Sequence, residues 1–522
     1  MTLDTVFENA RIIDGTGAPW FRGAVAVKNG RIDSVVRGGS VDESATECVD
    51  VDGHALCPGF VDTHSHSDLR LFEDPTLAPK TRQGVTTEVL GQDGFSMAPM
   101  YRSGGVDEWE DHLSGLDGRA GREWTWGSVA EYFDAVDESG VASNVAMLVG
   151  HGTVRFNVMG MDDRLPTETE LEEMAGLVTE ALEAGAVGFS TGLIYSPQVH
   201  SDTEEVRRLA SRLAPYGRPF VAHIRNETED IWTALDEFVD IGASEGVPLH
   251  LSHFKLALSP QHGKAERATG LIEAARERGV DITADQYPYT AGSTMLAVVL
   301  PSWVRADGTE QAVAYLSDEE SRAEIREEMA GRTEPWENTV VTSVASDANA
   351  HLEGLDIGAV AAERGTDPVT AVMDLLREER LEVSKITHML AERDVREILQ
   401  CERVTVATDG LFGGKPHPRT YGTYPRVLGH YVRDENLLSV EEAVRMMTSL
   451  PARAMGLERK GVVRPGMDAD LVVFDPLTVD TPATFTDPRQ HPEGIPHVVV
   501  DGEFVARDGE LTDATPGRTL RM

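Results

Sequence analysis

Apolar and polar positions follow two different rhythms along this chain of 522 residues. Near both ends, short runs such as GAVAVKNG and IPHVVVDGEFVARDG alternate apolar and polar residues around Asn-Gly or Asp-Gly pairs, a pattern typical of antiparallel strands joined by tight turns. Between the ends, apolar runs bounded by Gly or Pro alternate with helical stretches such as ETELEEMAGLVTEALEAG, which indicates β-α units and a parallel sheet. We therefore expect an α/β protein with a β-rich part built from both termini.

Eight apolar runs in the middle of the chain predict the strands of a distorted (β/α)8 barrel of the TIM type. These runs are 60–66, 85–93, 145–152, 186–192, 220–227, 248–255, 282–289 and 404–410. The interval between the seventh and the eighth run is far longer than an ordinary connection from a strand to a helix. We expect part of it, residues 290–350, to be an inserted subdomain that lies over the carboxyl end of the barrel as a lid, since it follows a barrel strand.

The two β-rich ends are expected to share one domain, because the termini of a domain often lie close together. Residues 1–57 and 460–522 would form a small β-sandwich domain. Residues 58–289 and 351–459 would form the catalytic barrel, interrupted by the lid of residues 290–350.

The net charge of -41, from 88 acidic and 47 basic residues, excludes two classes of partner. Nucleic acid and anionic membrane surfaces both attract cationic protein, so neither is expected to bind this chain. A solvated acidic surface that aids solubility explains the charge, and so does adaptation to high salt, where screening removes the self-repulsion. Both explanations remain open, and the sequence does not indicate an oligomeric state.

The chain shows no targeting pattern or disulfide framework. Its start, MTLDTVFENARIIDG, lacks a basic region followed by an apolar one, and no apolar run reaches the roughly 18 to 20 residues of a membrane helix. Cys48, Cys57 and Cys401 form no CxxC pair, so neither a disulfide scaffold nor a thiolate zinc knuckle is expected. These features favour a cytoplasmic protein.

Residues that can bind a metal or transfer a proton recur at the ends of the predicted strands. They are His64, His66, Asp93, His223, His253 and Asp409. The two imidazoles of the HxH pair would point the same way, because side chains on a strand repeat every two residues. Zinc prefers histidine nitrogen and carboxylate oxygen, polarises carbonyl groups and lowers the pKa of water. The pattern therefore predicts a zinc site suited to amide hydrolysis.

Several longer segments carry a resemblance to a known family. They are PGFVDTHSHSD, GVTTEVLGQDG, HIRNE, LSHFK, DQYPYTAGST, ATDGLFGGKPHPRTYGTYPRVLG and RPGMDADLVVFDP. Together they resemble the amidohydrolase superfamily and, within it, the N-acyl-D-amino-acid deacylases or D-aminoacylases, over nearly the whole chain. The resemblance implies the barrel, the small β-domain and the lid. It also implies zinc-dependent removal of the acyl group from a small substrate, an N-acyl-D-amino acid, with hydrophobic side chains as the expected preference.

The resemblance also implies roles for individual residues. His223 and His253 would hold the tighter zinc ion, and His64 and His66 would serve a second or weaker site, so that one or two ions bind. Asp409 would be the catalytic base, taking a proton from the attacking water and passing it to the departing amine. The substrate α-carboxylate would be held by the side chains of Arg419, Lys255, Tyr195 and Tyr287.

Two positions depart from the family pattern. Asp93, in GQDG, stands where the family commonly has a cysteine in GNCG, and carboxylate oxygen is a harder donor than thiolate sulfur. Phe254, in LSHFK, stands where a second histidine is common. Two other functions remain open. One is a cyclic-amide hydrolase such as a hydantoinase or dihydroorotase, although the run AVGFSTG lacks the lysine that those enzymes carboxylate. The other is an inactive scaffold homologue.

Overall fold

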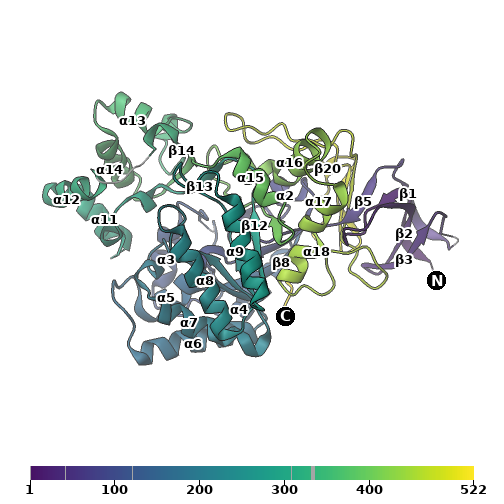
Figure 1. The fold of residues 1–522 in the computed structure, drawn as a ribbon, viewed down its shortest axis with the longest axis horizontal. Helices are drawn as coiled ribbons and strands as arrows, with labels where there is room; N and C mark the ends of the chain where they lie inside the picture. Colours follow the sequence, from purple (N-terminus) through teal and green to yellow (C-terminus); the bar gives the residue numbers. More distant parts are fainter. Residues whose placement is uncertain (1, 42, 120, 307, 331–334) are drawn as a thin grey trace.

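The computed structural model describes residues 2–41, 43–119, 121–306, 308–330 and 335–522. Its centre is a parallel sheet of eight strands in the order β16-β12-β11-β10-β9-β8-β7-β6 (Figure 1). The strands are β6 (Phe60–Asp62), β7 (Val85–Leu90), β8 (Asn144–Gly150), β9 (Gly188–Gly192), β10 (Phe220–His223), β11 (Leu249–Leu251), β12 (Ile282–Gln286) and β16 (Val404–Val406). A bridge between Ser65 and Gly410 joins the first strand to the last. Each predicted run overlaps one of these strands, so the predicted barrel is confirmed.

Helices between the strands cover the outside of the barrel (Figure 1). The longer ones are α4 (Val129–Ser139), α5 (His151–Met159), α6 (Glu168–Glu183), α7 (Thr203–Ala210), α8 (Ile231–Glu245), α9 (Ala265–Glu277), α15 (Glu392–Leu399), α16 (Arg419–Arg426) and α17 (Val440–Met447). Helix α6 shows why these segments are helical. A capping box between Thr167 and Glu170 begins it, and Leu171, Met174 and Val178 form its buried stripe.

The two termini share one nine-stranded sheet beside the barrel. Its strands are β1 (Leu3–Ile12), β2 (Phe21–Lys28), β3 (Arg31–Arg37), β4 (Ala45–Asp50), β5 (Ala55–Pro58), β17 (Leu471–Phe474), β18 (His497–Val500), β19 (Glu503–Arg507) and β20 (Glu510–Leu511). Strand β5 pairs with both β1 and β17, and Ile32 also donates a backbone hydrogen bond to Met467. The sheet therefore folds around one apolar core, to which both ends of the chain contribute.

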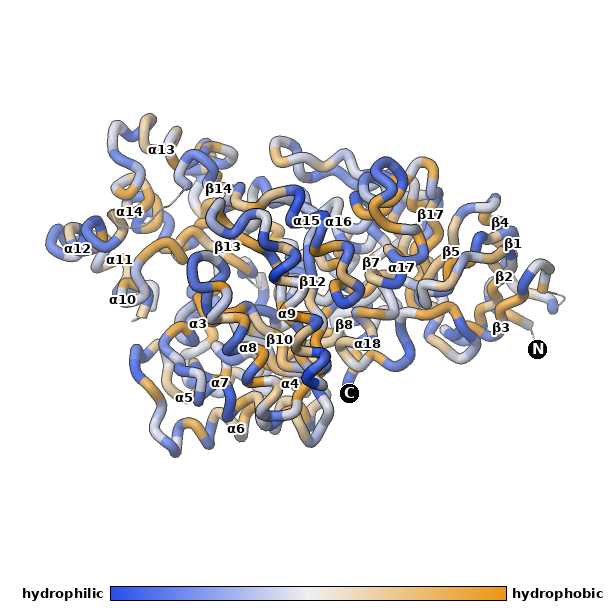
Figure 2. Tube along the Cα trace, viewed as in Figure 1, coloured by the Kyte–Doolittle hydropathy of each residue, from blue (hydrophilic) through white to orange (hydrophobic). Residues whose placement is uncertain are grey.

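The insert after β12 is larger than expected. It contains a three-stranded sheet in the order β13-β15-β14, with β13 (Ala291–Met295), β14 (Thr339–Val344) and β15 (Val383–His388). Its helices are α10 (Ser302–Arg305), α11 (Gly308–Ser317), α12 (Glu319–Ala330), α13 (Ile357–Arg364) and α14 (Pro368–Glu378), of which α12 is mostly hydrophilic (Figure 2).

The boundary expected at residue 350 does not match the end of this sheet. Strand β15 pairs with β13 and β14, and one apolar core runs from Leu296 to Val383, with α13 and α14 packed into it. The helical pattern of residues 351–400 looks like ordinary barrel sequence, because periodicity shows that a helix is amphipathic but not which core it covers. No helix among the described residues is long and apolar enough to cross a membrane.

Candidate active site and metal centre

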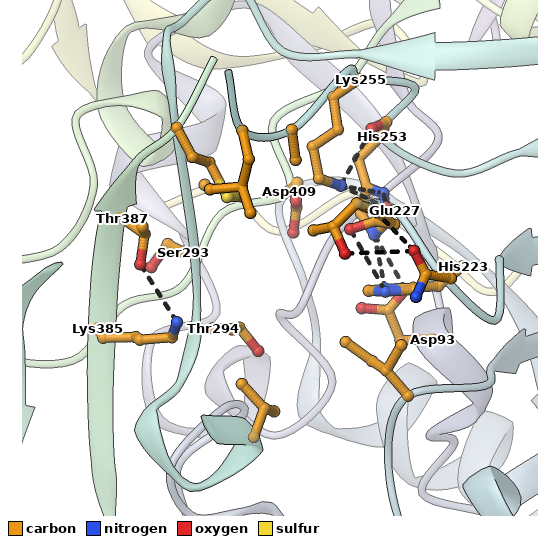
Figure 3. A pocket seen from close by; sticks show the side chains of 18 of the residues that line it. Asp93, His223, Glu227, His253, Lys255, Ser293, Thr294, Lys385, Thr387 and Asp409 are labelled. Carbon is orange, nitrogen blue, oxygen red and sulfur yellow. Dashed lines mark hydrogen bonds and ion pairs between the residues drawn. The ribbon is translucent and has the colours of Figure 1, made fainter. Parts of the chain in front are cut away.

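The six metal-ligand or acid-base residues predicted at the strand ends meet at the carboxyl end of the barrel. Three combinations place one donor atom from each member within 4.8 Å of the others: His64, His66 and Asp409; His64, Asp93 and His253; and His223, Glu227 and His253. Most of these side chains are buried, and Figure 3 shows Asp93, His223 and His253 close together at one side of the pocket. Convergence follows from the barrel, since parallel strands end at one face.

Asp93 lies at the centre of the cluster. Its Oδ1 atom is 3.6 Å from His64 Nε2, 3.6 Å from His223 Nδ1 and 3.6 Å from His253 Nε2, and its Oδ2 atom is 3.8 Å from His66 Nε2. Burial would raise the pKa of this carboxyl, but the surrounding imidazoles hold it well below its usual value. Asp93 is therefore an ionised carboxylate facing four histidines.

Most of these residues follow their strands rather than lie within them. His64 and His66 come after β6, so the strand periodicity expected to align them does not apply. Asp93, His253 and Asp409 have φ values of 55°, 34° and 50°, in the left-handed region that costs most residues energy. Only His223 is the last residue of its strand. Turns with strained backbone aim these side chains inward.

Asp409 contacts both the histidines and the expected substrate clamp. Its Oδ1 atom is 3.6 Å from His64 Nε2 and 3.5 Å from His66 Nε2, and its Oδ2 atom is 2.9 Å from Arg419 Nη1. Burial would raise the pKa of Asp409, but Arg419 and the imidazoles hold it far below its usual value. The carboxylate is thus ionised and able to accept a proton.

Arg419 is fully buried and joins the barrel to the insert. Its Nη2 atom donates to the carbonyl of Ser293 on β13 at 3.1 Å, and its guanidinium lies over the Tyr287 ring at 4.4 Å. His417 positions it, because its ring accepts a hydrogen bond from the Arg419 backbone N–H and contacts the Ala291 carbonyl at 3.0 Å.

Lys255 lies on the same side of the pocket as His223 and His253 (Figure 3). Its Nζ atom is 2.6 Å from Glu227 Oε1 and 2.8 Å from His253 Nδ1. Burial would lower the pKa of Lys255, but Glu227 raises it above its usual value. The ammonium group therefore holds the ring of His253, a predicted metal ligand, in place. Lys255 also lines the cavity.

Two carboxylates to which the sequence analysis assigned no role contact the histidines, although one of them begins the segment DQYPYTAGST. Asp117 Oδ1 contacts His66 Nδ1 at 2.9 Å, and Asp285 lies 3.8 Å from His64 Nδ1 and accepts the His253 backbone N–H at 2.7 Å. Such partners orient a ligating imidazole. Asp117 lies in the long excursion between β7 and β8 and Asp285 within β12, and neither has a spacing signal toward a histidine.

A cavity of about 500 Å³ extends from this cluster toward the insert. Figure 3 shows Asp93, His223, His253, Glu227 and Lys255 on one side and Ser293, Thr294, Lys385 and Thr387 on the other. Tyr195 and Tyr287 line it as expected, and the Tyr195 hydroxyl contacts Thr294 Oγ1 at 2.9 Å. Lys385 was not identified from the sequence. It lies on β15 of the insert and donates to Thr387 Oγ1 at 3.2 Å.

The donor set fits a divalent metal. Among the described residues, His64 Nε2, His66 Nε2 and Asp93 Oδ1 are buried without a hydrogen-bond partner, which is costly unless an ion contacts them. Donors held about 2.0–2.1 Å from a tetrahedral zinc lie roughly 3.4 Å apart. The distances of 3.5 to 3.8 Å from the two carboxylates to the imidazoles are close to that value.

The fold and the cluster define a barrel hydrolase with a metal centre at the carboxyl ends of its strands. Residues 47–506 match the profile of the Amidohydrolase family, and the chain belongs to that family.

Relatives that match the chain over its full length belong to a narrower group than the family as a whole. The chain is 36% identical to a D-aminoacylase of Alcaligenes xylosoxydans xylosoxydans, covering 99% of this chain and 97% of that protein. It is 35% identical to an N-acyl-D-glutamate deacylase of the same organism, covering 99% and 96%. The crystal structure of an N-acyl-D-glutamate deacylase from Bordetella bronchiseptica, complexed with zinc and a phosphonate mimic of the tetrahedral intermediate, superposes with a TM-score of 0.86 at 35% identity, covering 100% of both chains.

Proposed function

We propose that this chain is a zinc-dependent hydrolase that cleaves the amide bond of N-acyl-D-amino acids, releasing a carboxylate and a free D-amino acid. The observation that carries the proposal is the position of Asp93, 3.6 to 3.8 Å from four histidines, beside the Asp409–Arg419 pair. The full-length similarity to deacylases of D-amino acids supports the same reaction.

Asp93, His223 and His253 would hold one zinc ion, and His64 and His66 would serve a second. A bound zinc ion supplies Lewis-acid chemistry, polarising the amide carbonyl and lowering the pKa of a water molecule. Asp409 accepts a proton from the attacking water and returns it to the departing amine nitrogen. Its low pKa keeps it ionised before the reaction begins.

The α-carboxylate of the substrate would lie against Arg419, Lys255 and Tyr287. Lys255 and Tyr287 line the cavity, and the guanidinium of the fully buried Arg419 lies over the Tyr287 ring at 4.4 Å. A guanidinium fork and an ammonium group both suit a carboxylate. Tyr195 also lines the cavity, and its hydroxyl contacts Thr294 Oγ1 at 2.9 Å. A linear amide is favoured over a cyclic one because β9, with the sequence GFSTG, has no lysine to carboxylate.

The substrate side chain is proposed to be hydrophobic. Leu116, Ile194, Val298 and Val299 line the cavity and would cover an apolar side chain. One observation favours an acidic side chain instead, because Lys385 lines the same cavity and its ammonium group would attract a second carboxylate.

A panel of N-acetyl-D- and N-acetyl-L-amino acids, assayed beside a dipeptide and a hydantoin, tests the reaction. D-selective release of acetate is expected, fastest for leucine, methionine or phenylalanine derivatives, and hydrolysis of the hydantoin alone would refute the assignment. A preference for D-glutamate or D-aspartate that disappears in Lys385→Met would establish the acidic alternative. Elemental analysis of the purified protein for zinc tests the cofactor. Bound zinc would argue against an inactive scaffold, and a protein that binds no divalent ion would support one.

A cytoplasmic location belongs to the same proposal. Cys48, Cys57 and Cys401 are unpaired, as is usual where thiols stay reduced. Cell fractionation with an antibody to the chain tests it, and recovery outside the cytoplasm would contradict it.

A further inference from the structure

A second cavity adjoins the catalytic cavity described above. This outer chamber has a volume of about 270 Å³. Ser259, Pro260 and His388 line the outer chamber only and are exposed, so its far end meets solvent. The residues that line both cavities are Thr228, Glu229, Ala257, Leu258, Pro335 and Met389. Because the two cavities share this wall, a group bound at the metal centre can extend into the outer chamber.

We propose that the outer chamber binds the acyl chain of the substrate, and that the enzyme prefers unbranched apolar acyl groups of medium length, such as hexanoyl, to acetyl. The proposal rests on the proposed function, and it specifies the acyl half of the substrate.

The proposed position of the amine half leaves the outer chamber to the acyl half. An N-acyl-D-amino acid extends in three directions from its amide bond, through its carboxylate, its side chain and its acyl chain. The clamp of Arg419, Lys255 and Tyr287 would hold the carboxylate. The apolar wall that includes Val298 and Val299 would cover the side chain. The acyl chain then needs a third wall that starts at the metal centre.

The wall shared by the two cavities starts there. Residues 228–229 follow β10, whose last residue is the proposed metal ligand His223. Residues 257–258 follow the turn that contains His253, a second proposed ligand. Both segments line the catalytic cavity and continue into the outer chamber. A chain attached to the carbonyl carbon at the metal centre would therefore lie along them.

The backbone polar groups of this wall are already paired within the protein. Gln261 Nε2 donates to the Thr228 carbonyl at 2.7 Å, and the Leu258 N–H donates to the Met389 carbonyl at 2.8 Å. His262 Nε2 contacts the same Met389 carbonyl at 2.9 Å. The wall thus offers the side chains of Leu258 and Met389 to an occupant, and these suit an apolar group.

Leu258 is held at this wall at an energetic cost. Its φ of 67° is in the left-handed region, which is unfavourable for leucine. Such strain persists where the surrounding structure enforces it, and it is common at ligand sites. Leu258 is also partly exposed between the two cavities. An apolar occupant of the outer chamber would cover this side chain.

Charge disfavours a carboxylate in the outer chamber. Among the described residues that line it there is no lysine or arginine, and Glu229 is acidic and exposed. A carboxylate placed there would be repelled, whereas Lys255 and Lys385 line the catalytic cavity. A neutral acyl chain therefore suits the outer chamber better than the α-carboxylate or an acidic side chain does.

An acetyl group would use little of this space, because it has one methyl carbon beyond the scissile carbonyl. The volume of about 270 Å³ is many times the roughly 30 Å³ that one water molecule occupies in the liquid, so several methylene groups fit. Each methylene group moved from water to an apolar site strengthens binding by up to about fourfold. Longer acyl groups should therefore be better substrates.

A series of N-acyl-D-leucines that differ only in the acyl group tests the subsite. From N-acetyl through N-butanoyl to N-hexanoyl, kcat/KM of the zinc-loaded enzyme should rise by at least about tenfold in total. A series in which kcat/KM stays flat or falls would overturn the proposal.

Calorimetric titration of the zinc-loaded protein with acetate, butanoate and hexanoate gives a readout that does not depend on hydrolysis. The Kd should fall with each added methylene group, and equal Kd values would overturn the subsite. Binding that depends on chain length without D-selective cleavage would contradict the proposed function alone. D-selective cleavage of N-acetyl-D-leucine with a flat acyl series would contradict the acyl subsite alone.

A substitution that fills the outer chamber locates the effect. In Ser259→Trp, the ratio of kcat/KM for the hexanoyl substrate to that for the acetyl substrate should fall to near one. Ser44→Trp, at an exposed position before β4, is the matched control and should keep the wild-type ratio. A Ser259→Trp variant that keeps this ratio but changes the preference among side chains would show that the chamber holds the side chain, which would overturn the proposal. If the variant does not fold, the wild-type series and the titration still decide.

Discussion

Arg419 Nη1 lies 2.9 Å from Asp409 Oδ2, so the expected clamp for the substrate is paired with the expected catalytic base. The guanidinium also donates to Ser293 on the insert. It thus connects the base, the cavity and the inserted subdomain. A substrate carboxylate would share this guanidinium with Asp409, which leaves the other oxygen of Asp409 facing the histidines.

Asp409→Asn should abolish most of the hydrolysis while leaving tightly bound zinc in place. The amide cannot accept the proton of the attacking water, and loss of a general base costs about 10²- to 10⁴-fold in rate. The tight ligands would be Asp93, His223 and His253, which the substitution does not touch. Steady-state kinetics and elemental analysis check the two parts. Near-normal turnover would mean that Asp409 is not the base.

Arg419→Met should raise KM and lower kcat together. Removing one partner of a buried charge pair costs about 2–5 kcal/mol, and here the loss affects both substrate binding and Asp409. Arg419→Lys should recover part of kcat/KM, since the charge returns but the planar fork does not. Kinetics on the preferred substrate measure both values. An unchanged KM in the methionine variant would show that Arg419 does not contact the substrate.

Asp117→Asn should weaken metal binding without removing a ligand. Asp117 holds His66 Nδ1 at 2.9 Å, and loss of such a partner lowers metal affinity by about 10- to 100-fold. Zinc titration against a competing chelator gives the affinity. Asp111→Asn, in helix α3 (Gly105–Leu113) and 38% exposed, is the matched control and should not change it. Equal affinities in the two variants would exclude the role of Asp117.

Lys80→Met should destabilise the barrel where its first and last strands meet. Lys80, in helix α2 (Ala78–Thr81), is fully buried and donates to Asp62 Oδ2 at 2.6 Å and to Thr408 Oγ1. Loss of the ammonium leaves Asp62 buried without its cation, a change that costs about 3–5 kcal/mol. Urea denaturation measures it. Arg278→Met, at a side chain 56% exposed, is the control and should stay within about 0.5 kcal/mol.

Glu205→Gln should destabilise the protein at neutral pH more than at acid pH. Glu205 contacts Arg155 Nη1 at 2.6 Å and His151 Nε2 at 2.8 Å in a buried cluster. Burial would raise the pKa of Glu205, but His151 and Arg155 lower it below its usual value. Because the unfolded state then binds more protons, this stabilisation is complete above the unfolded pKa of about 4.3 and decreases as pH falls through the folded pKa.

Thermal unfolding of wild type and Glu205→Gln from pH 2 to pH 8 checks this dependence. The difference between the two proteins should stay near its maximum from pH 8 down to about pH 5 and should shrink below the unfolded pKa of about 4.3. A difference that stays constant with pH would show that the ionised carboxylate is not the source of the stability.

The sequence predicted the barrel and much of its catalytic end, because both depend on local patterns. Each barrel strand is a short apolar run, and His223, a proposed metal ligand, is the last residue of strand β10. The motifs also identified Arg419 and Tyr287, which lie in contact at the cavity. The extent of the insert could not be predicted, since β15 joins its sheet only through pairing with β13 and β14.

The sequence by itself determined which residue types are available and where each follows its strand. It placed Asp93 among the candidate ligands, and so determined that these candidates offer only oxygen and nitrogen donors. Only the tertiary structure decided that Asp93 lies 3.6 to 3.8 Å from four histidines, that Asp117 contacts His66, and that Arg419 is paired with Asp409. The physical reason is that these distances depend on closure of the barrel and on strained turns after its strands, which bring together residues separated by up to several hundred positions.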